Sequence, residues 1–272
     1  MHLAHVITAK GPSWVYQDER GSLMPIAEPV LTTSWRQPIG IEAPVTALEW
    51  LPPVPDIGRI FCVGLNYRSH AEEAGMDLPK TPVLFAKYAS SLVGHHHTTV
   101  VPAGVHQVDY EAELVIVMGA PCKDVAPSET LDYVAGYCNG NDLSARELQL
   151  ATSQWLLGKT LDGFAPVGPY LVTPDAIPDP DDLAIRCWVN GELKQSDRTS
   201  SMIFSCRTIV SYLSHYVTLL PGDLIFTGTP SGVVLGKPPQ EQVWLHPGDV
   251  VEVEVEGLGR LMTTIGGPPD AG

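Results

Sequence analysis

The sequence predicts a mainly β fold with a few helices, divided into a small β-rich N-terminal domain and a larger second domain. Short apolar runs parted by Gly and Pro fill most of the 272 residues, which is typical of strands joined by turns. Strands and helices do not alternate regularly along the chain, so neither a TIM barrel nor a Rossmann sheet is expected. With 44% hydrophobic and 17% charged residues, the composition is that of a globular protein.

The N-terminal domain is predicted to span residues 1–56. Three short strands are expected there, in segments 2–9, 13–18 and 22–28. A Pro-rich stretch then leads to Asp56, and we place the boundary at this residue because clustered prolines favour an extended linker. The second domain is predicted to comprise residues 57–272.

The first half of the second domain is predicted to be mostly strand. Residues 59–67 form an apolar run that breaks at Gly64, which indicates a strand and a turn. Residues 68–76 separate an apolar from a polar side at helical spacing, so a short helix is expected there. Residues 81–94 and 108–119 return to the strand pattern.

Helices are expected at three later places in the chain. Ser128 is predicted to cap a helix that has Glu129 in its first turn. A second helix is expected within residues 145–156. Apolar residues recur near helical spacing along residues 201–219, which predicts the longest helix of the chain.

Turn residues predict the remaining strands. Asn190 and Gly191, flanked by alternating residues, indicate a β-hairpin within residues 184–196. Two Pro-Gly-Asp turns each lead into a strand, at 221–223 before 224–230 and at 247–249 before 250–259.

The charge balance narrows the classes of partner. Lys and Arg total 16 against 31 Asp and Glu, which gives a net charge of -15 and argues against a nucleic-acid surface. An anionic substrate would therefore have to be held by a few local cations or by a metal ion. Five Cys without a CxxC pair suggest reduced thiols, and no apolar run is long enough to span a bilayer. A cytoplasmic protein without membrane partners is the expectation.

Residues 108–119 carry three carboxylates that indicate a metal site. On one continuous strand, Asp109, Glu111 and Glu113 would share a face. Carboxylates this close would repel each other, and a divalent cation with a preference for oxygen ligands, Mg²⁺, Mn²⁺ or Ca²⁺, would remove the conflict. Asp142 follows a β-like run and a Gly turn, and it is predicted to be the third ligand.

An exposed edge strand is the alternative explanation for Glu111 and Glu113, because isolated Glu-x-Glu pairs are common on half-solvated strands. The later strand with Glu252, Glu254 and Glu256 is interpreted in that way and is assigned no chemistry. The motifs around Glu111 decide between the two explanations.

Two further motifs could supply catalytic groups. His70 and Glu73 are three residues apart, so on a helix they are neighbours, and a carboxylate beside an imidazole can build a water-activating pair. Lys159 lies in a segment rich in Gly and Pro, where its cation could hold a carboxylate or an enolate. Each of these residues, taken alone, is better explained as a solvated surface charge.

Other polar residues could contact a substrate. Arg146 and Gln149 are three apart on a predicted helix and could offer a guanidinium fork and an amide. Thr229 lies in a Gly- and Pro-rich turn whose backbone N–H groups could cradle a carboxylate, although a purely structural turn explains it as well. His95–His97 is interpreted as a polar loop, with metal binding as a minor alternative.

Seven motifs in a fixed order resemble the C-terminal catalytic domain of the fumarylacetoacetate hydrolase family. They occupy residues 63–73, 82–94, 108–119, 137–149, 158–172, 189–196 and 219–233. The similarity runs from about Arg59 to Gly259, and the first domain loosely resembles the variable N-terminal module of longer bacterial members. The resemblance implies a mixed β-sandwich and roll with a metal at its open end, assembled as a homodimer.

The resemblance also implies roles for individual residues. Glu111, Glu113 and Asp142 match the family's Mg²⁺ or Mn²⁺ ligands, with Ca²⁺ as a further alternative. The catalytic group would be His70 and Glu73 as the water-activating pair and Lys159 as the residue that stabilises an enolate. The substrate oxygens would be held by Lys87, Arg146, Gln149 and Thr229. The His-rich turn at residues 94–99 departs from the family pattern.

These roles predict an enzyme that acts on a small 2-oxo acid. The expected reaction is metal-dependent hydrolysis of a C–C bond in a β-diketo or acylpyruvate-type acid such as fumarylpyruvate, through a pyruvate enolate, in the catabolism of aromatic compounds or sugar acids. An oxaloacetate-type decarboxylase or a 2-hydroxymuconate-type diacid isomerase would use the same metal site, and family membership alone does not choose among them. A metal-stabilised binding protein is the non-catalytic alternative; His70 and Glu73 argue against it, since binding needs no base.

Overall fold

The computed structural model describes residues 1–27, 31–33, 43–54, 57–73, 75 and 77–268. Eleven strands within these ranges form the largest sheet: β1 (His2–Thr8), β2 (Gly11–Gln17), β3 (Leu23–Ile26), β4 (Glu49–Leu51), β5 (Ile60–Gly64), β6 (Val83–Lys87), β7 (Leu92–Val93), β10 (Ala112–Met118), β11 (Val134–Asn141), β13 (Ala165–Val172) and β16 (Leu224–Phe226). Their order across the sheet is β3–β2–β1–β13–β11–β10–β16–β5–β6, with β4 beside β1 and β7 beside β13. The prediction of a mainly β fold is confirmed.

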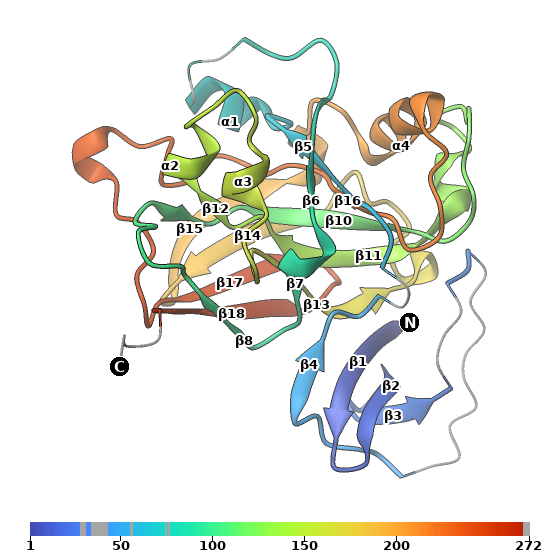
Figure 1. Cartoon of the computed structure of the whole chain (residues 1–272). Helices are drawn as coiled ribbons and strands as arrows, with labels where there is room; N and C mark the ends of the chain where they lie inside the picture. Colours follow the sequence, from blue (N-terminus) through green and yellow to red (C-terminus); the bar gives the residue numbers. More distant parts are fainter. Residues whose placement is uncertain (28–30, 34–42, 55–56, 74, 76, 269–272) are drawn as a thin grey trace.

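A second sheet packs against the first. It is formed by β8 (His97–Val100), β14 (Ala184–Val189), β15 (Glu192–Arg198), β17 (Val250–Val255) and β18 (Arg260–Gly266), in the order β15–β14–β17–β18–β8. A short ladder joins β9 (Val108–Asp109) to β12 (Ser144–Ala145). Because β10 contacts both β14 and β17, the two larger sheets form a sandwich (Figure 1).

The helices are short and lie around the sheets. They are α1 (Arg68–Glu73), α2 (Arg146–Gln149), α3 (Leu156–Lys159) and α4 (Cys206–Tyr216), with 3₁₀ segments η1 (Ala89–Ser91), η2 (Thr130–Tyr133), η3 (Pro174–Ala176), η4 (Thr199–Ser201) and η5 (Pro239–Glu241). Figure 1 shows α1, α2 and α3 gathered at one end of the molecule and β1–β4 at the opposite end.

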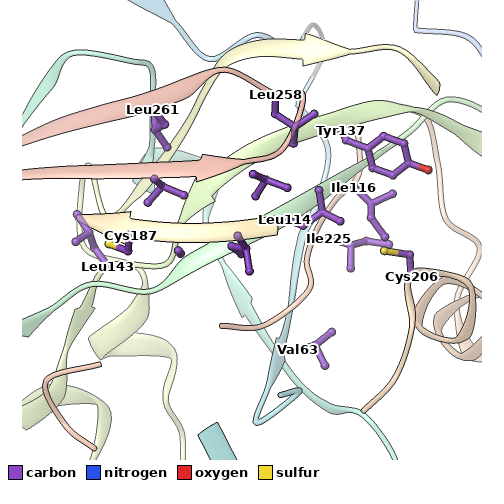
Figure 2. Close-up of a cluster of buried hydrophobic side chains, with 14 of the residues drawn as sticks. Val63, Leu114, Ile116, Tyr137, Leu143, Cys187, Cys206, Ile225, Leu258 and Leu261 are labelled. Carbon is purple, nitrogen blue, oxygen red and sulfur yellow. The ribbon is translucent and has the colours of Figure 1, made fainter. Parts of the chain in front are cut away.

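Apart from Glu113, strand β10 is apolar, because protein covers both of its faces. Leu114 and Ile116 belong to the core between the two sheets, which Figure 2 shows, whereas Val115 and Val117 belong to a second cluster on the other side. Strand β17 is different: Val251, Val253 and Val255 are buried, while Glu252 and Glu254 alternate with them. Arg260 binds both of these glutamates, which are partly exposed. The interpretation of this segment as an edge strand is wrong, because β17 pairs with β14 on one side and β18 on the other.

Most local predictions of helices and turns are confirmed. The helix predicted within residues 201–219 is α4, which begins later than expected, and the Ser205 hydroxyl accepts a hydrogen bond from the backbone of Thr208. The hairpin joins β14 to β15, with Asn190 at φ 52° and Gly191 at φ 80°. Two consecutive residues with positive φ are what a tight type I′ turn requires.

The helix predicted to begin at Ser128 is wrong. Only Thr130–Tyr133 forms a 3₁₀ turn, and no side chain caps it. The following residues form β11, which is buried along its whole length between β10 and β13. Two neighbouring strands satisfy the backbone of this segment, and that tertiary pairing outweighs the local helix signal. The helix expected within residues 145–156 is likewise divided into α2 and α3.

The N-terminal strands continue the main sheet. β1 pairs with β13 as well as with β2 and β4, so the first 26 residues extend a ladder of the second predicted domain. The predicted boundary, Asp56, lies outside the described residues, and the division into two domains stays a prediction. In the described part of the chain, no helix is long and apolar enough to cross a membrane.

Candidate active site

A cavity of about 310 Å³ opens where α1, α2 and α3 meet the ends of the central strands. Its polar lining residues are His70, Glu73, Glu111, Glu113, Arg146, Gln149, Lys159 and Thr229. Its other lining residues are Val63, Gly64, Leu65, Phe85, Leu150, Trp155, Leu235 and Gly236. Eight of the ten predicted site residues therefore line this cavity. Of the other two, Asp142 binds the lining residue Lys159, and Lys87 binds Asp142.

Three buried carboxylates converge at the base of the cavity. Glu111, Glu113 and Asp142 each place one oxygen within 4.8 Å of the others, and within the described ranges they are the cluster that could hold a metal ion. Glu113 lies on β10, and Asp142 follows β11, the neighbouring antiparallel strand. The backbone N–H of Asp142 donates to the carbonyl of Glu111 at 2.9 Å, which fixes the two residues side by side.

The expected continuous strand over residues 108–119 is wrong, and the break changes what Asp109 does. β9 ends at Asp109 and β10 starts at Ala112, so Asp109 and Glu113 lie on separate strands, and Asp109 does not belong to the group that Glu111 and Glu113 form with Asp142. Asp109 instead accepts hydrogen bonds from the backbone N–H groups of Val234 at 2.8 Å and Leu235 at 3.0 Å. It thereby ties the stretch before Glu111 and Glu113 to the loop that forms one wall of the cavity.

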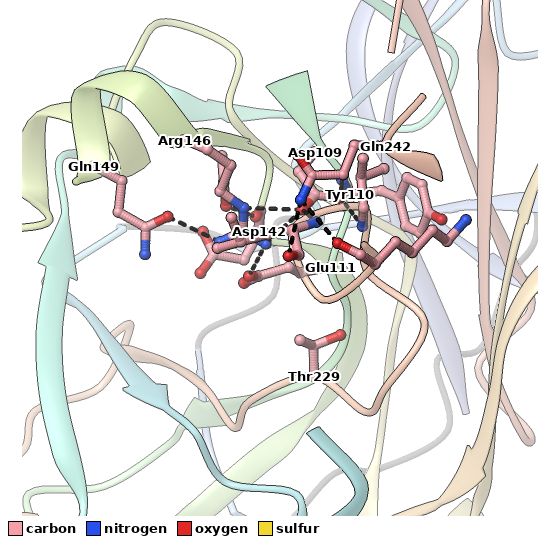
Figure 3. Close-up of polar contacts among 12 residues, drawn as sticks. Asp109, Tyr110, Glu111, Asp142, Arg146, Gln149, Thr229 and Gln242 are labelled. Atoms are coloured by element: carbon pink, nitrogen blue, oxygen red, sulfur yellow. Dashed lines mark hydrogen bonds and ion pairs between the residues drawn. The ribbon is translucent and has the colours of Figure 1, made fainter. Parts of the chain in front are cut away.

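Three cations surround the carboxylates. The Lys159 ammonium donates to Glu111 at 2.6 Å and to Asp142 at 2.8 Å, and Lys87 donates to the second oxygen of Asp142. Arg146 donates to Glu111 at 2.7 Å (Figure 3). Burial alone would raise the pKa of Glu111, but Lys159 and Arg146 outweigh it and lower that pKa to about 2.

Glu113 has a different environment. Its carboxylate accepts a hydrogen bond from the backbone N–H of Gly228 at 2.7 Å, and no ion pair joins it to any described cation. Burial, followed by the charges of Asp142 and Glu111, raises the pKa of Glu113 well above its ordinary value. This carboxylate is the one that lacks compensating positive charge.

The charges of the cluster fit a divalent cation. The buried set holds four carboxylates against three cations: Asp109, Glu111, Glu113 and Asp142 against Lys87, Arg146 and Lys159. An all-oxygen donor set with excess negative charge suits Mg²⁺ or Mn²⁺ rather than a softer metal, and Ca²⁺ shares the preference for oxygen. The donor set therefore agrees with the cofactor predicted from the sequence.

His70 and Glu73 face the cavity from α1. His70 Nδ1 lies 3.5 Å from a carboxylate oxygen of Glu73, an ion-pair distance rather than a formed hydrogen bond. Glu73 also accepts the backbone N–H of Gly232 at 3.2 Å. A Cβ on Gly236 would lie 2.3 Å from the Glu73 carboxyl carbon, so the glycine leaves room for this side chain.

The four predicted substrate-binding residues fall into two groups. Thr229 and Gln149 line the cavity, on opposite sides in Figure 3. Arg146 also lines it, but its donors are directed to Asp109, Glu111 and Gln149. Lys87 lies behind Asp142 and does not belong to the lining. In this geometry Arg146 and Lys87 position carboxylates, and their role in substrate binding stays a prediction.

Two positioning residues were not predicted from the sequence. Gln195 is buried, and its amide donates to the Thr229 hydroxyl and to the Pro230 carbonyl, both at 2.8 Å, while its oxygen accepts from the backbone of Ala112. Alternation after the Asn-Gly turn would place Gln195 on the inner face of β15, but not against a specific loop. Asp109 was noted as acidic, but neither its contacts with the backbone of Val234 and Leu235, more than a hundred residues away, nor its ion pair with Arg146 was predicted.

The His95–His97 segment lies away from this cavity. His95 accepts a hydrogen bond from the backbone of Met262 at 3.0 Å and packs edge-to-face on Trp50. Among the described residues, these histidines do not come together as a metal-binding group. The interpretation as a polar loop is kept for this segment, and His97 begins β8.

Comparison with known proteins adds independent information. A family model described as "Fumarylacetoacetate (FAA) hydrolase C-terminal" matches residues 59–266. A rat protein named oxaloacetate tautomerase Fahd2a is 42% identical to the chain over 82% of the chain and 71% of its own length.

Solved structures of similar proteins differ in the reaction that their descriptions give. A 5-carboxymethyl-2-hydroxymuconate delta-isomerase from Mycobacterium smegmatis has a TM-score of 0.83 and 33% identity, and covers 98% of this chain and 100% of its own. A fumarylpyruvate hydrolase from Pseudomonas aeruginosa, in complex with Mn²⁺ and pyruvate, has a TM-score of 0.72 and 31% identity over 82% of this chain and 93% of its own. The same fold thus carries tautomerase, isomerase and hydrolase names.

Proposed function

Because the chain belongs to the fumarylacetoacetate hydrolase family, we propose that it is a divalent-metal-dependent keto–enol tautomerase of 2-oxo acids. The observation that carries the proposal is the pairing, in one cavity, of a base candidate with a permanently charged ammonium beside a carboxylate cluster. The name of the rat relative supports the choice of reaction.

A divalent cation held by Glu111, Glu113 and Asp142 would supply a Lewis acid for the keto and carboxylate oxygens of a 2-oxo acid. The neighbouring groups hold this donor set in place: Arg146 fixes Glu111, Lys87 fixes Asp142, and the Gly228 N–H orients Glu113. Residues that hold metal ligands in this way narrow the geometry that a bound ion can adopt.

Lys159 acts as a fixed positive charge in this mechanism. Burial would lower its pKa, but Asp142 and Glu111 outweigh burial and raise it, so the side chain stays an ammonium. A neutral amine would be needed for Schiff-base chemistry. An ammonium instead stabilises the negative oxygen that develops when a 2-oxo acid loses a proton from C3, an electrostatic contribution of the kind that often dominates catalysis.

The His70 and Glu73 pair is the proton-transfer group. In the proposed step the base takes a proton from C3, the C–H electron pair forms the C2–C3 double bond, and the keto oxygen gains a proton. Keto and enol forms contain the same atoms, so no water is consumed and nothing is oxidised. Glu73 orients the imidazole for this transfer in the way that carboxylates commonly orient catalytic histidines.

Hydrolysis of an acylpyruvate C–C bond is the second candidate. The same His70 and Glu73 pair could orient a water instead of removing a C3 proton, and the similar P. aeruginosa structure is described as a fumarylpyruvate hydrolase. Both reactions, as well as decarboxylation of oxaloacetate, pass through an enolate stabilised at the same place.

The test compares these reactions on one preparation of the metal-loaded enzyme. Ketonisation of enol-oxaloacetate is followed by ultraviolet absorbance, and pyruvate release is measured from oxaloacetate and from acetylpyruvate or fumarylpyruvate. We expect fast ketonisation that is lost after chelation and restored by Mg²⁺ or Mn²⁺. Cleavage of fumarylpyruvate without enol turnover would replace the proposal with the hydrolase, and ketonisation that is insensitive to chelation would contradict the metal site.

A further inference from the structure

We propose that the cavity selects 2-oxo acids whose substituent on C3 is planar and apolar, such as an aryl ring, and that Trp155, Phe85 and Gly64 form the subsite for that group. The proposal rests on the proposed function, because it assigns the end of the substrate that the tautomerase chemistry leaves free. The tautomerase reaction alone does not require an apolar group on C3, since a small diacid can undergo it. The subsite therefore predicts a substrate preference that the reaction does not.

Two aromatic side chains form one wall of the cavity. Phe85 on β6 and Trp155 just before α3 meet edge-to-face, with ring centroids 5.6 Å apart and planes at 67°. Both side chains are only partly buried, so aromatic surface remains available to a ligand. Leu150 and Leu235 extend the apolar surface of the cavity. Aromatic walls of this kind hold flat apolar groups in small-molecule sites.

Gly64 makes the position of the indole possible. A Cβ on Gly64 would lie 2.6 Å from Cζ3 of Trp155, a distance at which the two atoms would overlap. The indole therefore lies directly against the backbone at the end of β5, and any side chain at residue 64 would displace it. Trp155 is held in a defined place and is not simply an exposed aromatic residue.

The apolar wall begins beside the reacting end of the cavity. The Lys159 ammonium lies 5.1 Å from the centre of the Phe85 ring, within the range of a cation–π contact. If Lys159 stabilises the oxygen on C2, the substituent on the adjacent C3 is placed next to Phe85 and Trp155. An aryl group there would also be conjugated with the enol double bond.

A second carboxylate would not find a free cation in this place. Lys159 and Arg146 are the Lys and Arg residues that line the cavity in the described part of the chain, and both are ion-paired with Glu111. Glu73 is a further acidic residue of the lining. A buried carboxylate without a cationic partner loses solvation and gains nothing in return.

The first experiment measures binding of unreactive analogues, so that it does not depend on turnover. Phenyllactate and malate carry the 2-hydroxy acid group but cannot form an enol in the same way, and they differ in the apolar ring against the second carboxylate. With the Mn²⁺-loaded enzyme and calorimetry, we expect phenyllactate to bind at least about tenfold more tightly than malate. Equal or tighter binding of malate would overturn the proposal.

The second experiment measures the ratio of kcat/KM for enol-phenylpyruvate to that for enol-oxaloacetate. In the reaction a proton and an electron pair shift between C3 and the keto oxygen in both substrates, so only the substituent differs. We expect Trp155→Ala to lower the ratio by at least about tenfold. Gly64→Ala adds a methyl group where the Trp155 indole lies, so it should also lower the ratio. This second variant tests the subsite even if Trp155→Ala does not fold.

A matched control distinguishes the subsite from general damage. Leu157 is exposed on α3, two residues from Trp155, and does not line this cavity, so Leu157→Ala should leave the ratio unchanged. An equal fall of kcat/KM for both substrates in Trp155→Ala and in Gly64→Ala would overturn the proposal. Preference for phenyllactate without turnover of any enol would support the subsite and remove the proposed function instead.

Discussion

Glu113 and Glu111 are two residues apart, yet their surroundings shift the pKa values of their carboxylates in opposite directions. Glu111 is bound by Lys159 and Arg146, and its pKa falls to about 2. Glu113 has a single backbone donor, and burial together with Asp142 and Glu111 raises its pKa. The cost of placing this carboxylate in the interior is offset when a metal ion binds, so Glu113 should contribute to metal affinity rather than to the stability of the metal-free protein.

Substitution of Glu113 tests this division. In Glu113→Gln, we expect Mn²⁺ affinity to fall at least about a hundredfold, because one of three charged ligands becomes neutral, while the free energy of unfolding without metal changes by less than about 1 kcal/mol. Calorimetric titration and urea unfolding measure the two quantities. Glu254→Gln on β17 is the matched control and should leave both nearly unchanged. A destabilised metal-free protein with normal affinity would assign Glu113 a structural role.

Lys159 should influence metal binding and turnover in opposite directions. Lys159→Met removes a positive charge that competes with the metal for Glu111 and Asp142, so Mn²⁺ should bind more tightly. The same change removes the charge that stabilises the enolate, and kcat should fall by about 10²–10³-fold. Titration with Mn²⁺ and steady-state kinetics measure the two effects.

The control for this variant is Lys194→Met, because Lys194 pairs with Glu192 on β15, away from the cavity. Neither quantity should change in it. If Lys159→Met bound metal more weakly and lost activity in proportion, Lys159 would be a support for the ligands and not a stabiliser of the enolate.

At the scale of elements, local signals predicted the strands and turns that depend on nearby residues. The Asn-Gly hairpin and the cap of α4 are local features, and both appear in the structure. The break between β9 and β10 was not predictable in this way. It exists because Asp109 accepts the backbone N–H groups of residues 234 and 235, and nothing near Asp109 in the sequence indicates that contact.

The helix predicted at Ser128 shows that a local signal can also be overridden by distant contacts. Its capping signal was real, but β10 and β13 pair with the chain that follows and make it a strand. The three proposed metal ligands were named from the sequence because a repeat of two and a turn bring them near each other. The roles of Gln195 and Trp155 were not predicted from the sequence, because the residues that they contact lie in segments whose position depends on the whole fold.

The cap of α4 provides a prediction about one element. Ser205 accepts the Thr208 backbone N–H, one of the donors that a helix start leaves unsatisfied. Ser205→Ala should lower the free energy of unfolding by about 1 kcal/mol without changing enol turnover. Urea unfolding checks this value, and the exposed Ser196→Ala on β15 serves as the control. An unchanged midpoint for Ser205→Ala would show that water replaces the cap at no cost.

At the scale of the whole molecule, two of the contacts that connect the N-terminal strands to the second predicted domain are informative. One is the ladder of β1 with β13. The other is the junction of Gly94 and His95 with Trp50 on β4, where a Cβ on Gly94 would lie 2.1 Å from the Trp50 carbonyl oxygen. The expected homodimer, cytoplasmic location and catabolic role also concern the whole molecule, and they stay predictions.

This junction should make stability depend on pH. Burial and the neighbouring His96 lower the pKa of His95 to about 4, and its Nδ1 must stay unprotonated to accept the Met262 N–H. In the unfolded chain a histidine titrates near 6.5, so between these values the unfolded state binds more protons. The contribution of His95 is therefore complete above about pH 6.5 and is lost as the pH falls toward 4.

The His95→Asn variant keeps a hydrogen-bond acceptor but does not titrate. Between pH 7 and pH 5 its free energy of unfolding should fall by about 1 kcal/mol less than that of the parent protein, a value that allows for the partial exposure of His95. Urea unfolding at both pH values gives the difference. His106→Asn, at an exposed position, should behave like the parent protein. Identical pH profiles for His95→Asn and the parent would mean that His95 is protonated in the folded protein without penalty.

The three cations of the carboxylate cluster have a consequence for how the enzyme acquires its ion. Lys87, Arg146 and Lys159 neutralise most of the acidic charge within the polypeptide itself, so the protein can reach its folded form before any metal arrives. Loading is then an exchange at a finished site and not a folding event, in contrast to domains that collapse only around their ion. The species bound at any moment would follow the supply of free divalent ions in its surroundings.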